Sequence, residues 1–431
     1  MPLRLDSKNA DFAARFRDFL AVKREAAQDV ETAVRNILAE VKAYGDRALL
    51  QLTLKFDRLD LAKVGMRVGA EEIEAAAKSC EPQALNALKL ARDRIEAYHL
   101  RQKPKDERYT DALGVELGSK WTAIEAVGLY VPGGTAAYPS SVLMNAVPAK
   151  VAGCARLVMV VPAPDGKLSP LVLAAAKLAG VDEIYRIGGA QAVAALAYGT
   201  ETIAPVAKIV GPGNAYVAAA KRLVFGQVGI DMIAGPSEVL ILADKTGNPD
   251  WIAADLLAQA EHDASAQSIL ITDDAALADQ VEKAVASQLT TLPRAAIAGA
   301  SWRDFGAIIL VRKLADAIAL VDRLAPEHLE IAAEDAEALV PKIRNAGAIF
   351  IGAHTPEAIG DYVAGSNHVL PTAHSARFSS GLGVLDFMKR TSLLKCGPEQ
   401  LHALGPAAIA LGEAEGLSAH ARSVAIRLNR R

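Results

Sequence analysis

The sequence predicts an α/β protein with two parallel-sheet domains, a helical N-terminal segment and a small helical C-terminal subdomain. Three observations lead to this prediction. Residues 9 to about 100 are mostly helical in pattern, and from Val127 short β-rich runs alternate with Ala-rich helices. After about residue 380 the chain is punctuated by glycine and then becomes helical again. Strands that alternate with helices at this spacing are typical of parallel βαβ units.

The composition excludes several classes of protein. The chain has 431 residues, which is enough for two or three domains, and its net charge of -3 gives no reason to expect nucleic acid or an anionic membrane as a partner. The N-terminus lacks the apolar core of a signal peptide, and no apolar run approaches the length of a membrane span. The three cysteines are far apart, so neither a disulfide framework nor a zinc ribbon is indicated. We therefore expect a soluble, cytoplasmic protein.

The first α/β series occupies residues 127–236. Its apolar runs each end in a Gly/Pro turn: GLYVPGG, LVMVVPAPDG, IYRIGGAQ, KIVGPGN and DMIAGPSE. The strand-to-helix turns of a parallel sheet lie at its carboxyl edge, where open α/β sheets bind ligands, and glycine lets backbone N–H groups approach phosphates closely. A nucleotide site is one interpretation. A set of tight connections is the other, because GPGNAY lacks the last glycine of GxGxxG and no Walker-type motif is present. Tyr130, Gln191 and Asn214 each stand at one of these turns.

The second α/β series follows as EVLILAD, SILITDD, AIILVRK and AIFIGAH. These runs are continuously apolar, as strands buried on both faces should be. A helix is predicted over 249–263, with Asn248 as its N-cap and Pro249 at its first position. The chain ends in the basic sequence RSVAIRLNRR, which we interpret as part of an appended subdomain or an oligomer arm.

The histidines give the first indication of chemistry. Four of the eight lie in segments dense with other polar groups: His262, His328, His368 and His420. Gln259 and His262 are three residues apart, so on a helix they share a face and could hold one metal ion. Together with Asp361 and His420 they would form an N/O ligand set that suits Zn²⁺, with Mn²⁺ or Co²⁺ as substitutes. The alternative is a capped helix end with a solvated histidine, since neither HExxH nor a finger spacing occurs.

The motif APEHLE carries an adjacent acid and base. Glu327 and His328 could both face one cavity if the motif is a loop, and they could then transfer protons at two stages of a reaction. The alternative is a helix N-terminus, because Pro326 followed by Glu327 suits a first turn. Ser237 precedes an apolar run without a GxSxG elbow, and we interpret it as a hydrogen-bonding residue rather than a nucleophile.

Nine segments, in the same order, resemble the motif series of the histidinol dehydrogenase family. They run from about residue 120 to the C-terminus, and the helical N-terminal part is similar to the family as well: VGLYVPGGTAAYPSSVLMNAVPAKVAG, IGGAQAVAALAYGT, KIVGPGNAYVAAAKR, DMIAGPSEVLI, AQAEHD, APEHLE, GDYVAGSNHVLPT, RFSSGLGVLDFMKRTS and EGLSAHARS.

The resemblance implies a zinc- and NAD-dependent enzyme that oxidises L-histidinol through L-histidinal to L-histidine, with one Zn²⁺ in each subunit. By motif match the zinc ligands, which would also contact the substrate, are Gln259, His262, Asp361 and His420. The implied acid/base pair is Glu327, which would also contact the substrate, and His328. Further substrate contacts are implied for Ser237, His368 and Glu415, and cofactor contacts for Tyr130, Gln191 and Asn214. The family is similar in being a homodimer, in which Glu415 and His420 would act in trans.

The expected domains follow from these assignments. They are an N-terminal helical arm (1–25), a Rossmann-like domain with the metal and catalytic residues (26–126 plus 237–380), a Rossmann-like NAD-binding domain (127–236) and a C-terminal dimerisation subdomain (381–431). Each sheet could be a full or a truncated dinucleotide fold. Three other functions stay open: a related zinc/NAD dehydrogenase for another amino alcohol or a sulfonated diol, a zinc hydrolase with Glu327 activating water, and a non-catalytic binding protein.

Overall fold

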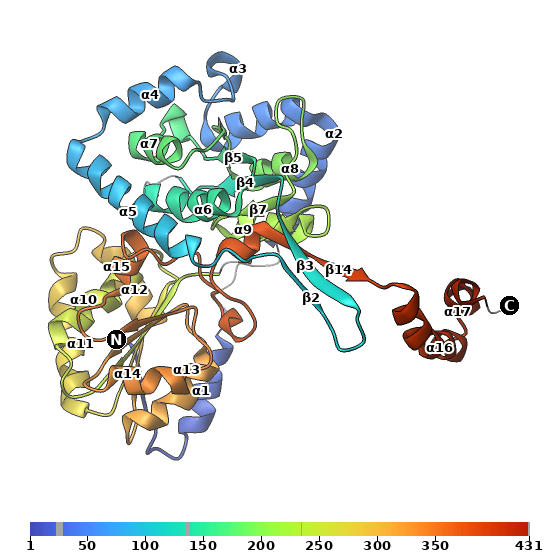
Figure 1. Ribbon diagram of the computed structural model, residues 1–431. Helices are drawn as coiled ribbons and strands as arrows, with labels where there is room; N and C mark the ends of the chain where they lie inside the picture. The colour runs from blue at the N-terminus through green and yellow to red at the C-terminus, as the bar shows by residue number, and fades with distance from the viewer. Residues whose placement is uncertain (23–28, 134–137, 234, 430–431) are drawn as a thin grey trace.

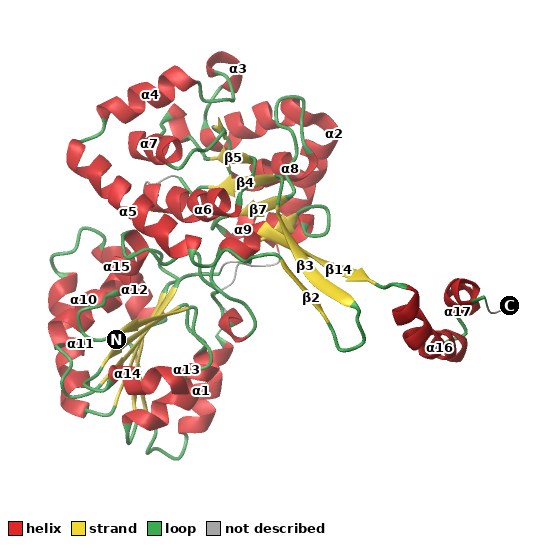
Figure 2. Cartoon of the chain, viewed as in Figure 1, coloured by secondary structure: helices red, strands yellow, loops and turns green. Residues whose placement is uncertain are grey.

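A computed structural model of the chain describes residues 1–22, 29–133, 138–233 and 235–429. These residues form two parallel sheets with helices packed on their faces and one small antiparallel sheet (Figure 2). The predicted α/β class with two parallel sheets is therefore confirmed. Within the same ranges, no helix has both the length and the hydropathy that a membrane span requires.

The first parallel sheet has five strands in the order β6-β5-β4-β7-β8. They are β4 (Ala126–Tyr130), β5 (Arg156–Val160), β6 (Glu183–Tyr185), β7 (Lys208–Val210) and β8 (Gly229–Ile230). The connecting helices are α6 (Pro139–Ala152), α7 (Pro170–Leu178), α8 (Gly189–Tyr198) and α9 (Ala215–Val224). Four of the predicted strands lie where the sequence places them. The fifth, β8, comes just before the predicted run DMIAGPSE, which instead forms the crossing to the other sheet.

The N-terminal helices cover this same sheet. They are α2 (Asp29–Asp57), α3 (Leu61–Val64), α4 (Ala70–Ser79) and α5 (Pro82–Leu100). Leu38 and Leu49 of α2 share an apolar core with Leu196 of α8, and Ile95 of α5 shares one with α6. We expected residues 26–126 to belong with 237–380, and the packing differs from that expectation. The amphipathic pattern of these helices shows that they bury one face, but it does not show which sheet receives that face.

The second parallel sheet has six strands in the order β1-β11-β10-β9-β12-β13. They are β1 (Leu3–Asp6), β9 (Glu238–Ala243), β10 (Gln267–Thr272), β11 (Ala307–Leu310), β12 (His328–Ala332) and β13 (Ala348–Ile351). Its helices are α1 (Phe12–Ala21), α10 (Pro249–Ala260), α11 (Ala275–Leu289), α12 (Ala295–Asp304), α13 (Ile318–Leu324), α14 (Ala336–Leu339) and α15 (Glu357–Tyr362). Every residue of β9 and β10 is buried, as expected of strands covered on both faces. The expected N-terminal helical arm (1–25) differs, because its first residues form the edge strand β1.

The antiparallel sheet carries the C-terminal helices. It consists of β2 (Glu107–Thr110), β3 (Glu116–Ala123) and β14 (Met388–Lys395), in the order β14-β3-β2. Figure 1 shows α16 (Pro398–Ala414) and α17 (Ser418–Ala425) at the far end of this sheet, away from both parallel sheets. We call residues 388–429 the C-terminal arm. Short 3₁₀ helices occupy Pro164–Gly166, Leu314–Ala317, Val340–Lys342, Ser375–Arg377, Val384–Phe387 and Ile426–Leu428.

Two connections hold the parallel sheets together. The crossing segment 231–237 joins the carboxyl end of β8 to the amino end of β9. Seven residues span at most about 25 Å, so these two sheet edges lie near each other. The segment after α15 returns to the first half, where Asn367 Nδ2 donates to Met144 O of α6 (2.7 Å) and Arg94 Nε of α5 donates to Val363 O (2.8 Å).

Candidate active site

The residues predicted to contact a cofactor all lie at the carboxyl edge of the five-stranded sheet. Tyr130 is the last residue of β4, Gln191 lies in the first turn of α8 after β6, and Asn214 caps α9 after β7. Their side chains shape these turns: Tyr130 Oη accepts from Gly189 N (3.0 Å), and Asn214 Oδ1 accepts from Tyr216 N (3.1 Å). Tyr130 and Gln191 are buried. The structure therefore brings all three to one sheet edge, as turn-forming residues.

The acid/base candidates begin a central strand of the other sheet. His328 is the first residue of β12, Glu327 directly precedes it, and both are buried. The motif is neither the loop nor the helix N-terminus that the sequence left open. Helix α13 ends at Leu324, and its C-cap Ala325 has a φ of 44°. Pro326 cannot continue the helix, so the chain turns directly into β12. The strand then holds His328 beside Val239 of β9 and Ala348 of β13.

The backbone of β9 fixes the proton positions on His328. Its Nδ1 lies 2.9 Å from Glu238 O, and a carbonyl oxygen can only accept, so Nδ1 carries the hydrogen. When the ring is neutral, Nε2 then has the free lone pair. It is buried, makes no hydrogen bond, and lies 3.4 Å from Asp361 Oδ1. This atom is thus placed as a proton acceptor inside the site.

Several carboxylates surround His328. Glu327 Oε2 and Glu357 Oε2 both lie 3.7 Å from its Nδ1, and Glu327 Oε2 also accepts from Glu238 N (2.9 Å). Burial raises the pKa of Glu327 to about 7. Burial lowers the pKa of His328, but the Glu327 and Glu357 carboxylates raise it by more, so the pKa lies well above its ordinary value. The surrounding carboxylates therefore favour the protonated ring, and His328 must lose that proton before its Nε2 can act as a base.

Three of the four implied metal ligands come from neighbouring elements. Gln259 lies in the last turn of α10, and Asp361 belongs to α15. His262 follows the end of α10, so it does not share a helical face with Gln259 as expected. Burial lowers the pKa of His262, which favours the neutral imidazole that a metal ion needs. Asp361 Oδ1 is buried without a hydrogen bond, so a donor atom is available. These N/O groups fit Zn²⁺ in donor type.

The ligand set is incomplete within one chain. Across the described ranges, no three His, Cys, Asp or Glu side chains converge closely enough to hold a metal ion. His420 and Glu415 lie exposed in the C-terminal arm, which Figure 1 shows far from α10 and α15. The structure therefore does not bring these two residues to Gln259 and Asp361 of the same chain.

The remaining substrate candidates flank the acid/base pair. Ser237 directly precedes β9, next to Glu238. His368 influences the pKa of Asp361, which places the two groups near each other, and its Nε2 is buried without a hydrogen bond. Burial lowers the pKa of His368. Sequence reasoning missed Glu238 and Glu357; Glu357 follows a proline at a helix start, a position typical of a surface cap, and gave no sign of its burial.

The candidate acid/base groups occupy the amino edge of the six-stranded sheet. Glu238 starts β9 directly after Ser237, and His328 starts β12 directly after Glu327, whereas open α/β sheets usually bind ligands at the carboxyl edge. The short crossing segment explains the difference, because it joins the carboxyl edge of the five-stranded sheet to this amino edge. The fold and site thus define a two-sheet α/β enzyme, with nucleotide-type turns on one sheet and a buried acid/base pair on the other.

Comparisons with known proteins identify the family. A family model described as histidinol dehydrogenase matches residues 20–428. The histidinol dehydrogenases of Rhodopseudomonas palustris and Bradyrhizobium diazoefficiens are each 74% identical to this chain, and the matches cover 100% of this chain and of each relative. The crystal structure of histidinol dehydrogenase from Elizabethkingia anophelis superposes with a TM-score of 0.95 at 37% identity, covering 99% of this chain and 98% of that one. The chain belongs to the histidinol dehydrogenase family, and it is accordingly an NAD-dependent oxidoreductase that acts in histidine biosynthesis.

Proposed function

We propose that the protein carries out the zinc- and NAD-dependent four-electron oxidation of L-histidinol, via L-histidinal, to L-histidine. The observation that carries this proposal is the buried pair Glu327 and His328, with the unpaired Nε2 of His328 beside Asp361. Family membership supports the substrate class, and the geometry supports the assignment of the proton-transfer residues.

The metal site would combine residues of two subunits. Gln259, His262 and Asp361 of one chain supply a carboxamide, an imidazole and a carboxylate, and His420 of the partner subunit would complete the set. Zn²⁺, when bound, would supply a positive charge that holds the substrate nitrogens and so fixes the position of the reacting carbon. His368 and Ser237, with Glu415 of the partner subunit, would contact the rest of the substrate.

The acid/base pair divides the proton transfers. His328 Nε2 accepts the hydroxyl proton of L-histidinol while a hydride leaves its carbon for NAD⁺, which yields L-histidinal and NADH. Glu327 then removes a proton from a water molecule as the water oxygen adds to the aldehyde carbon, and His328 returns its proton to the aldehyde oxygen, which gives the hydrate. His328 accepts a proton from one hydroxyl of the hydrate as a second hydride leaves for a second NAD⁺, which yields the carboxylic acid, and the acid then loses its proton to give the carboxylate. Both groups are buried, so the aldehyde would be held away from bulk water.

The two NAD⁺ molecules would bind in succession at the turns of the five-stranded sheet, where Tyr130, Gln191 and Asn214 lie at one edge. That edge is connected by the crossing segment to the strands carrying Ser237 and His328, which would place a nicotinamide near the alcohol carbon.

The C-terminal arm supports a homodimer. The arm exposes several large apolar side chains, and apolar surface gathered on one element is typical of an interaction site: Leu394, Leu404, Leu411, Leu417 and Ile426. Docking of the arm on a second copy would bury them, and it would also carry Glu415 and His420 to the partner subunit's site.

The proposal is tested by counting electrons. Zinc-loaded protein is incubated with limiting L-histidinol and excess NAD⁺, NADH is measured by absorbance, and the product is identified by mass spectrometry. We expect two NADH and one L-histidine per L-histidinol. One NADH with free aldehyde would contradict the hydration role of Glu327. No NADH from metal-loaded protein would favour a related amino alcohol or a sulfonated diol as the substrate.

A further inference from the structure

A buried ion pair at the carboxyl edge of the five-stranded sheet takes no part in the proposed chemistry. Lys221 of α9 and Asp231, the first residue after β8, form this pair, and their side chains are 3% and 1% exposed. Removing two charges from water is costly, and hydrophobic residues in their place often stabilise a protein as well or better. We therefore expect the ion pair to position a specific segment of the chain.

Both members of the pair hold the same residue, Gly211. Lys221 Nζ donates to Gly211 O (2.9 Å), and Asp231 Oδ2 accepts from Gly211 N (2.8 Å). Gly211 begins the turn that follows β7, and this turn ends at Asn214, the N-cap of α9. The pair thus fixes the orientation of the first residue of the turn through its backbone donor and its backbone acceptor.

The turn also packs tightly against Tyr130. Gly211 has a φ of 112°, and a Cβ at this position would clash with the Tyr130 carbonyl oxygen. Only glycine allows this approach, so the ends of β4 and β7 are in direct backbone contact. A shift of Gly211 would therefore disturb two of the three turns assigned to the cofactor.

Asp231 connects this turn to the catalytic sheet. It is the first residue of the crossing segment 231–237, and Glu238, directly after that segment, donates its N–H to Glu327. The same segment is held at Gly235, whose N–H donates to Thr372 Oγ1 (2.6 Å). The ion pair thus fixes the segment at its first residue, and Thr372 fixes it near its end.

We propose that Lys221 and Asp231 are positioning residues for the cofactor: they hold the Gly211 turn in the conformation that binds the dinucleotide and set the start of the crossing segment relative to it. This inference rests on the cofactor site proposed above. Neither residue touches the reacting atoms. Their loss weakens dinucleotide binding without removing the zinc ligands.

The test uses the double variant Lys221→Met/Asp231→Asn in the zinc-loaded protein. It leaves no unpaired buried charge, keeps an oxygen that can accept from Gly211 N, and removes the donor to Gly211 O. Loss of a hydrogen bond from a charged donor predicts a Kd for NADH that is roughly tenfold higher. NADH fluorescence gives the Kd, metal analysis gives the zinc content, and thermal unfolding gives the stability. If this double variant does not fold, Lys221→Leu/Asp231→Asn, which also leaves no unpaired buried charge, is measured in the same way.

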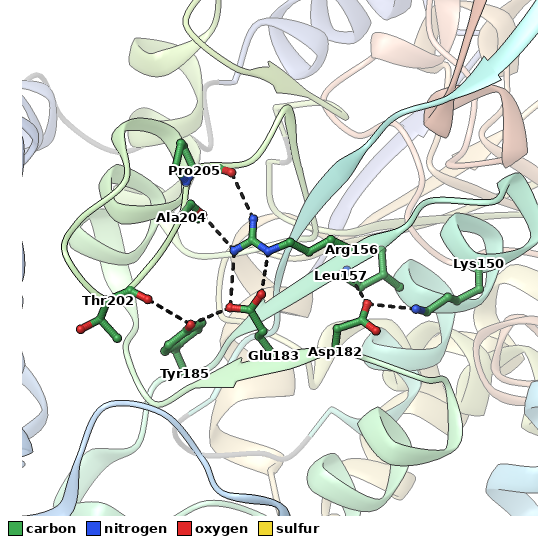
Figure 3. A network of polar contacts seen from close by, with 9 residues as sticks. All are labelled: Lys150, Arg156, Leu157, Asp182, Glu183, Tyr185, Thr202, Ala204 and Pro205. Atoms are coloured by element: carbon green, nitrogen blue, oxygen red, sulfur yellow. Dashed lines mark hydrogen bonds and ion pairs between the residues drawn. The ribbon is translucent and has the colours of Figure 1, made fainter.

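A matched control lies at the opposite edge of the same sheet. Figure 3 shows the ion pair between Arg156 and Glu183, the first residues of β5 and β6, in which Arg156 Nε lies 2.6 Å from Glu183 Oε1. Arg156 Nη2 also donates a hydrogen bond to Ala204 O (3.0 Å). Arg156→Met/Glu183→Gln removes a pair that is less buried, with side chains 24% and 18% exposed, and that lies at the amino edge. It is expected to lower the unfolding temperature and leave the Kd for NADH unchanged.

The possible outcomes distinguish failure of the positioning role from failure of the proposed cofactor site. A raised Kd for NADH with normal zinc content in the Lys221/Asp231 variant, against an unchanged Kd in the control, supports the positioning role. An unchanged Kd with a fall in stability like that of the control overturns it. Gln191→Ala is measured alongside: if it weakens NADH binding while the pair variant does not, only the positioning role fails. If Gln191→Ala leaves binding unchanged, the proposed cofactor site is wrong and the inference fails with it.

Discussion

Substitution of Glu330 tests how the buried acidic side chains beside His328 are stabilised. Glu330 lies two residues after His328 in β12 and is buried, and its Oε1 accepts from Glu357 N (2.6 Å) at the start of α15. Burial and then the charge of Asp255 raise the pKa of Glu330 to about 8, and burial raises the pKa of Asp255 to about 6. Near neutral pH Glu330 is therefore protonated and donates a hydrogen bond to Asp255. It acts as a neutral link between α10 and α15.

The perturbation compares Glu330→Gln with Glu330→Leu. Gln can accept from Glu357 N and donate to Asp255, so both interactions are kept. At about pH 4.5, where ionisation of Glu330 in the unfolded chain does not yet contribute, stability is expected to change by less than about 1 kcal/mol. Leu leaves Glu357 N without an acceptor in a buried position, which costs about 1–3 kcal/mol. Because α15 carries Asp361, the Leu variant is also expected to bind Zn²⁺ more weakly than the Gln variant.

The pH dependence provides a second readout. The raised pKa means that folded protein keeps a proton on Glu330 that the unfolded chain has lost above its ordinary pKa of 4.5. Stability from this group is full below that value and declines as pH rises toward about 8. Glu330→Gln removes this contribution. The free energy of unfolding of the variant should therefore fall less steeply between about pH 5 and pH 8 than that of the wild type.

The assay is denaturant unfolding of zinc-loaded protein across this pH range. A Gln variant as destabilised as the Leu variant, or a pH dependence identical to that of the wild type, would refute the assignment of Glu330 as a protonated link.

Three further predictions concern the site. Asp361→Asn should lower zinc affinity by at least roughly tenfold, since even residues behind the ligands contribute that much, and equilibrium dialysis would contradict the assignment if affinity were unchanged. His328→Asn should reduce turnover by roughly a hundredfold or more while zinc content stays normal, and near-normal turnover would show that another group is the base. Glu327→Gln and His420→Ala, each inactive alone, should regain about a quarter of wild-type activity when coexpressed, because half of the dimers would hold one intact shared site; no recovery would mean that His420 acts within its own chain.

Much of the fold could be predicted from pattern alone. The run EVLILAD became β9 because a strand covered on both faces must be apolar at every position, and the sequence shows that directly. Strand β12 could not be predicted in the same way. Its residues HLEIA carry a histidine and a glutamate, and both are buried because neighbouring groups satisfy them: Glu238 O contacts His328, and Glu357 N contacts Glu330. Burial of this kind depends on partners far away in the sequence.

Sequence motifs could propose residues for the site, but they could not predict how those residues are arranged. The motifs name Gln259 and Asp361, yet only the structure shows α10 and α15 meeting beside β12. Glu357 escaped notice because its contact with His328 crosses from one element to another. The position of His420 in the C-terminal arm could not be derived from spacing, since a residue that would complete the site of another chain has no periodic relation to the ligands of its own.

The first strand has a consequence for how the protein is made. β1 pairs with β11, so Leu3 cannot pair until Ala307 has been synthesised, some 300 residues later. The five-stranded sheet and its covering helices are meanwhile complete by residue 230. The five-stranded sheet can therefore condense on the ribosome before most of the six-stranded sheet has been synthesised. During that interval, β1 lacks the strand with which it pairs. β11 is complete by residue 310, whereas β12 and β13 are made later and lie on the other side of β9, so pairing of β1 can bring the first residues synthesised into the six-stranded sheet before that sheet is finished.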